Sequence, residues 1–185
     1  VNGAGGAGVG VQLGQLEDAS FETGYSADVN FNVVDDANDI TAALSGDTTD
    51  AMDNAASLVV SGGTATVTEA SDIQDITSYD ASNSSYTISD TAGAILGDTG
   101  TVIDDGVSTI NVNGPVGAGV GVQLGQLEDG LQLESGISSD IIFDVEDSAA
   151  NIVANADELD EARNITVYDT VNGYVSDASM ADASI

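Results

Sequence analysis

The segment Ser26–Ile40 reads SADVNFNVVDDANDI, and Ser138–Ile152 reads SSDIIFDVEDSAANI, so one pattern occurs twice at an offset of 112 residues. Apolar residues alternate with polar ones in both copies, which predicts a half-buried strand. The strand is followed by the motif D-x-A-x-x-I, which begins at Asp35 and again at Asp147. A third occurrence begins at Asp90, after the alternating residues Tyr86 and Ile88. We therefore expect a strand and a short helical turn as the recurring unit.

Each unit also has a second apolar stretch about 20–25 residues after the first: Leu58–Val60, Ile110–Val112 and Ile165–Val167. A strand, a short turn or helix and another strand, repeated along the chain, are typical of a solenoid. The expected fold is therefore mainly β, a solenoid-like stack of short strands with short helical turns. A β-sandwich built from the repeated strands is the alternative. In either fold, Val33, Ile88 and Val145 should lie in the core.

A longer repeat contains these units. Val1–Asp18 and Val112–Asp129 are identical at 16 of 18 positions, at an offset of 111 residues. The domain division that follows is a first long repeat over residues 1–111, with short units near 26–80 and 81–111, and a second, incomplete repeat over residues 112–185. Because the chain starts and stops inside repeats, we expect a longer native polypeptide, or copies that associate end to end.

The repeated block is rich in glycine, and Gly3–Gly8 has the spacing G-x-G-x-x-G of a dinucleotide-binding loop. The second copy has Val116 in place of Gly5, which removes that spacing and argues against nucleotide binding. The following residues alternate between apolar side chains and glycine, which favours a strand. Its glycine-lined face, at Gly8, Gly10 and Gly14, would let another backbone approach closely. A flexible glycine-rich connection is the alternative.

Charge and composition restrict the function. The chain has 32 Asp and Glu residues, one Lys or Arg, no His and no Cys, for a net charge of −31. Such a chain cannot neutralise the phosphates of nucleic acid, and it is repelled by anionic membrane surfaces. It also lacks most of the side chains that serve as general bases and nucleophiles. We expect no enzymatic activity, no nucleic-acid binding and no insertion into a membrane.

The carboxylates point to cations as partners. Calcium takes six to eight oxygen ligands from carboxylates and loop carbonyls, and Asp-rich strand ends supply both. Helix capping and solvation are the alternative roles of the same side chains. The expected Ca2+ ligands recur at strand ends: Asp35, Asp36, Asp90, Asp104, Asp105 and Asp147.

The phrases YTISDTAGAI, DVEDSAANI, LDEARNITV and VSDASMADASI resemble the repeats of very large secreted bacterial surface proteins, and the resemblance extends over the three short units. These proteins are adhesin-like, S-layer-like or matrix-forming, and calcium-associated. The nonapeptide GGxGxDxUx of their calcium roll is absent from this chain. The resemblance implies an extracellular or cell-surface location and dependence on calcium.

We therefore expect an extracellular structural repeat protein that forms a filament, sheath or surface layer by self-association, stabilised by calcium. Its partners would be copies of itself and, in addition, an extracellular glycan. An adhesin or ligand-binding segment of a large cell-surface protein is the alternative function.

Overall fold

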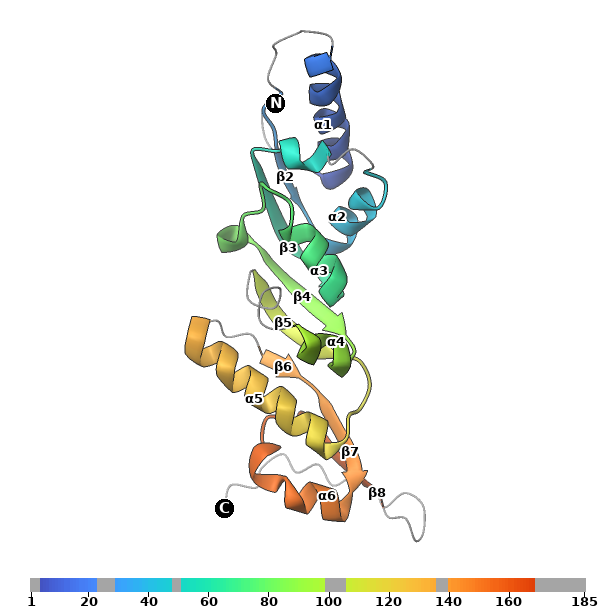
Figure 1. Cartoon of the computed structure of the whole chain (residues 1–185), viewed down its shortest axis with the longest axis vertical. Coiled ribbons are helices and arrows are strands. Elements are labelled where there is room, and N and C mark those ends of the chain that lie inside the picture. The colour runs from blue at the N-terminus through green and yellow to red at the C-terminus, as the bar shows by residue number, and fades with distance from the viewer. Residues whose placement is uncertain (1–3, 23–28, 48–50, 99–105, 136–139, 169–185) are drawn as a thin grey trace. The chain divides into compact units, whose positions relative to one another are not determined.

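The computed structural model describes residues 4–22, 29–47, 51–98, 106–135 and 140–168 (Figure 1). Six strands are hydrogen-bonded in chain order into one sheet: β1 (Ala4–Gly5), β2 (Asn32–Asp35), β3 (Ser57–Ala65), β4 (Ser85–Asp90), β5 (Val107–Val112) and β6 (Asp140–Ile142). Two more, β7 (Asp144–Ser148) and β8 (Asn164–Tyr168), form a second sheet. The pairings β1–β2, β2–β3, β3–β4, β5–β6 and β7–β8 are all parallel.

Helices alternate with the strands, so the prediction of a mainly β fold was wrong, and so was the alternative of a sandwich. The chain is an α/β protein with a parallel sheet. Successive parallel strands must be joined by crossover connections, which are most often helices. The helices are α1 (Ala7–Glu22), α2 (Ala37–Leu44), α3 (Val67–Gln74), α4 (Ala92–Gly97), α5 (Ala118–Ser135) and α6 (Ala149–Ala154), with short 3-10 turns η1 (Ala51–Asn54), η2 (Ala81–Asn83) and η3 (Ala156–Glu158).

The recurring motif D-x-A-x-x-I is a strand end followed by a capped helix. The side chains of Asp36, Thr91 and Ser148 each accept a hydrogen bond from the backbone N–H three residues on, which satisfies one of the free donors at the start of a helix. Thr66 caps α3 in the same way and completes a capping box with Glu69. The motif therefore encodes a strand end followed by a short capped helix, which agrees with the short helical turn expected from the sequence.

The chain divides into two units, each with its own core: residues 1–88 with 105–107, and residues 89–104 with 108–185. Val33 and Ile88 are fully buried in the first unit, and Val145 is buried in the second, so the prediction that these three side chains lie in the core is confirmed. The isoleucine of each motif is also buried: Ile40, Ile95 and Ile152. The alternation in the sequence therefore identified the buried strand face correctly.

The glycine-rich blocks form helices, α1 and α5, and the prediction of strands there was wrong. In a helix, residues four apart share a face, so Gly10 and Gly14 of α1 lie on one ridge, and Gly6 directly precedes the helix. A Cβ atom on Gly10 would lie 2.7 Å from Val33 Cγ2 of β2, and one on Gly14 would collide with the Ala51 carbonyl of η1. The close approach expected of this glycine face is therefore made by helices against their own unit.

Substitution of single glycines in α1 tests this packing. Gly14→Ala should destabilise the chain by about 1–3 kcal/mol, because the added methyl group has no room against the Ala51 carbonyl. Gly8→Ala is the matched control, since a Cβ there meets nothing within 4 Å. It should raise stability by up to about 1 kcal/mol through helix propensity. Urea unfolding followed by circular dichroism measures both, and equal effects of the two substitutions would contradict the packing.

Candidate functional site

Asp35, at the end of β2, joins the first glycine-rich helix to the sheet. The Ala7 backbone N–H, in the first turn of α1, donates to Asp35 Oδ2 at 2.9 Å. The Asp36 backbone N–H donates to Asp35 Oδ1 at 3.0 Å. A carboxylate at the start of a helix also interacts favourably with the helix dipole. One side chain therefore fixes where α1 begins relative to β2.

The second repeat has the equivalent contact at Asp147, at the end of β7. We call each of these contacts, between a strand-end carboxylate and the first turn of a glycine-rich helix, a joint. The Ala118 backbone N–H of α5 donates to Asp147 Oδ2 at 3.0 Å, and the Ser148 N–H donates to Oδ1 at 2.7 Å. The Asn151 side-chain amide adds a third donor at 2.8 Å. These hydrogen bonds, led by that from Asn151, hold the pKa of Asp147 below its ordinary value of 3.8.

Glycine precedes the helix at both joints. A Cβ on Gly6 would lie 2.9 Å from Asp35 Oδ2, and one on Gly117 would lie 3.3 Å from Asp147 Oδ2. The identical residues of the two repeats therefore occupy positions where the helix, the strand end and the carboxylate meet closely. The positions that differ, Ala4 and Gly5 against Pro115 and Val116, lie before the joint.

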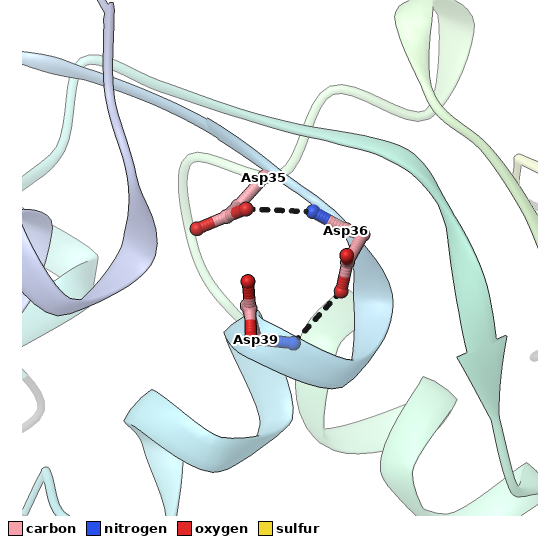
Figure 2. Close-up of side chains that lie close together, drawn as sticks. All are labelled: Asp35, Asp36 and Asp39. Atoms are coloured by element: carbon pink, nitrogen blue, oxygen red, sulfur yellow. Dashed lines mark hydrogen bonds between the residues drawn. The ribbon is translucent and has the colours of Figure 1, made fainter.

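Three carboxylates gather at the first joint, where Asp39 of α2 lies beside Asp35 and Asp36 (Figure 2). One oxygen from each lies within 4.8 Å of the other two. Calcium binds oxygen at about 2.3–2.6 Å, so ligands on opposite sides of the ion are about 5 Å apart, and this spacing fits one ion. The bonds from Ala7, Asp36 and Asp39 N–H groups leave further oxygen lone pairs for a cation.

The second repeat replaces two of these carboxylates with neutral groups. Ser148 stands where Asp36 stands, and Asn151 stands where Asp39 stands. Asn151 donates a hydrogen bond to Asp147, whereas ionised Asp39 has no side-chain proton to donate to Asp35. The two joints share one geometry, but only the first places three acidic side chains together.

The expected calcium ligands are thus brought together in part. Asp35 and Asp36 lie in the cluster, and Asp39 completes it. Asp90 and Asp147 lie at other strand ends, where they accept backbone N–H groups. Asp104 and Asp105 fall outside the described residues. Sequence reasoning missed Asp39, although its position one helical turn after the Asp36 cap indicated that the two would lie side by side.

A cavity of about 350 Å³ lies in the first unit, between α2, η1 and α3. Its apolar lining comes from Leu44, Met52 and Ile76, of which Met52 and Ile76 are buried. Its acidic lining consists of Asp47, Asp53, Asp72 and Asp75. A cavity of this lining suits a ligand with an apolar body and a positive charge.

Arg163, the only Lys or Arg residue of the chain, forms a salt bridge within its own unit. Arg163 Nε and Nη2 donate to Asp144 at 2.9 and 2.7 Å, and this two-pronged contact lowers the pKa of Asp144 and raises that of Arg163. The Arg163 side chain is 57% exposed, so the pair adds little stability. Because Arg163 contacts Asp144, no described Lys or Arg side chain neutralises the carboxylates of the acidic cluster or of the cavity.

Comparison with protein-family models, with curated proteins and with solved structures found no match. None of the described helices is long and apolar enough to cross a membrane.

The joint at Asp147 predicts a dependence of stability on pH. A carboxylate whose pKa is lowered by folding stabilises the fold above its unfolded pKa, and this stabilisation is lost as pH falls through the folded value. Asp147→Asn should therefore lower the melting temperature at pH 7, with the difference from the parent shrinking as the pH falls toward 2. Asp160→Asn, at an exposed position, is the control. A difference that stays constant with pH would contradict the role of the ionised carboxylate.

Proposed function

We propose that this chain is a structural segment of an extracellular assembly built from copies of itself and stabilised by calcium. The observation that carries the proposal is the repeated joint. Two segments that are identical at 16 of 18 positions place a helix N-terminus on a strand-end carboxylate and a glycine face against the sheet. Packing explains the identity at Gly6, Gly10 and Gly14, and a protein made of repeated packing units can serve as a scaffold.

Calcium has a physical role in this proposal. Two carboxylates about 4 Å apart repel each other by roughly 1–4 kcal/mol, depending on the local dielectric, and the first joint holds three of them. An ion that binds only the folded chain stabilises it by mass action. The neutral residues of the second joint remove the same repulsion without an ion. Calcium is therefore proposed for the Asp35–Asp36–Asp39 cluster and not for the Asp147 joint.

A structural role also agrees with the chemistry that the side chains offer. The sequence has no His and no Cys, and its only Arg or Lys is Arg163, paired with Asp144. A carboxylate pair alone can catalyse glycoside hydrolysis, but such sites set one acid with a raised pKa against one ionised partner. The pKa values of Asp80, Asp144 and Asp147 are lowered by hydrogen bonds from neighbouring side chains, which favours the ionised form and not that of an acid catalyst. We therefore propose no reaction for this chain.

The internal repeat supplies the variant that tests the calcium site. Asp36→Ser with Asp39→Asn converts the first joint into the second while keeping a good helix cap. Calcium should raise the melting temperature of the parent chain well above the effect of sodium chloride at equal ionic strength, and the double variant should lose this difference. Without calcium, the variant should melt at a higher temperature than the parent, because the repulsion is gone.

A matched control removes the same two charges elsewhere. Asp157→Ser with Asp160→Asn changes exposed residues of the second unit and should keep the response to calcium. If sodium chloride stabilised the parent as well as calcium does, screening alone would account for the effect and the site would be excluded. If the parent stayed monomeric with and without calcium, self-assembly would be excluded.

The acidic cavity favours a second candidate function, that of a ligand-binding or adhesive segment. Its apolar floor and four carboxylates suit the stem and ammonium group of a lysine side chain or a polyamine. A partner with basic side chains would be attracted by the net charge of −31 as well. This function would be exercised by single copies and does not need self-association.

Spermidine is a suitable probe of the cavity. We expect calorimetry to show saturable binding to the parent chain, weakened by roughly several-fold in Asp72→Asn with Asp75→Asn, because two rim charges are lost. The control is Asp157→Asn with Asp160→Asn, which removes equal charge away from the cavity. Equal weakening by both pairs would show attraction to net charge only and would reject the cavity as a site.

A further inference from the structure

The two glycine-rich helices have the same sequence on their outer faces but different surroundings. Val9 and Leu16 of α1 are 50% and 57% exposed, and they share a face because they lie seven residues apart. Their counterparts in α5, Val120 and Leu127, are partly buried. An apolar face that is covered in the second unit is therefore open in the first.

The helix α4 is the additional neighbour of α5. In the first unit α1 packs against α2, η1 and β2, which are the counterparts of α6, η3 and β7 around α5. The second unit also packs α4 against α5, and both helices belong to that unit. The residues of α4 are AGAILG, with no charged side chain. The chain itself thus shows that a short uncharged helix fits beside a glycine-rich helix of this sequence.

The helix α6 is built like α4, but among the described residues its outer face is more exposed. Each follows a strand-end Asp, begins after a Thr or Ser cap and buries the isoleucine of its motif. The next residue is Leu96 in α4, which is partly buried, and Val153 in α6, which is 76% exposed. The residues of α6, AANIVA, are also uncharged. Within the part of the chain that the structure describes, the glycine-rich helix of the first unit and the short helix α6 of the second unit thus each have an exposed apolar face.

The geometry points to a head-to-tail interface in which α6 of one copy packs on the Val9–Leu16 face of α1 in a second copy, as α4 packs on α5. This inference rests on the proposed self-association and names its surface. Both faces are free of charge, which matters in a chain where most other contacts between copies would bring carboxylates together. Because the two surfaces differ, the interface leaves one of each free, so that further copies can add to form an open row or a closed ring.

Two single substitutions distinguish this interface from others. Leu16→Asp places a carboxylate in the apolar face of α1, and Val153→Asp places one in the apolar face of α6. Each should weaken association of the full chain in calcium by at least about tenfold, measured by sedimentation velocity, because a carboxylate would be left in an apolar contact. An equimolar mixture should form dimers and nothing larger, since each variant keeps the surface that the other has lost.

Val34→Asp is the control, because Val34 is 41% exposed on β2, outside both surfaces, and this variant should associate like the parent. If Leu16→Asp abolished association while Val153→Asp did not, copies would meet through α1 alone, and the head-to-tail interface would be wrong. If neither mattered while the parent still associated, this interface would be wrong but the proposed assembly would stand. A monomeric parent would overturn both.

Cross-linking gives a second measurement that does not depend on weakened binding. The chain has no cysteine, so Leu16→Cys and Val153→Cys each carry one thiol. Under mild oxidation, the mixture should yield mainly the mixed disulfide dimer, at several times the amount of either symmetric dimer. A mixed dimer at only about twice the amount of each symmetric dimer, which is the ratio of random pairing, would contradict the interface.

Discussion

The rest of the structure depends on the bond between a strand-end carboxylate and the first turn of a glycine-rich helix. Asp35 accepts the Ala7 N–H, and Asp147 accepts the Ala118 N–H. This contact places the helix so close to the sheet that its inner face has room for glycine, as at Gly10 and Gly121. Helix start, glycine spacing and strand end must therefore be kept together, which explains why the repeat is nearly invariant over this block.

The sequence predicted the strands that end at the two joints, but it did not predict the glycine-rich helices that begin there. Alternation before D-x-A-x-x-I identified β2, β4 and β7 and their buried side chains, because a strand with one buried face leaves a period of two. The glycine block misled because Val9, Val11 and Leu13 also alternate. In α1, the pattern that matters is the four-residue spacing of Gly10 and Gly14, which Gly6 continues just before the helix, and a search for alternation with a period of two does not detect it.

The acidic site was predictable in part, because two of its three carboxylates follow a strand that the alternation identified. Asp35 and Asp36 were chosen because they end a strand, and the structure brings them together. Asp39 was missed, although the helical turn expected after the Asp36 cap already brings the third residue after the cap to the same side. The cavity between α2, η1 and α3 required tertiary packing, because its lining comes from three separate segments.

Composition and fold together explain the mode of assembly that we propose. A chain with 32 acidic side chains and one basic side chain can approach its copies only where carboxylates are absent or neutralised. The uncharged faces of α1 and α6 meet the first condition, and calcium at the Asp35–Asp36–Asp39 cluster meets the second. Electron microscopy of the purified chain in calcium tests this account most directly. The account predicts rows or closed rings of copies at a constant spacing, and a field of single particles at the same concentration would contradict it.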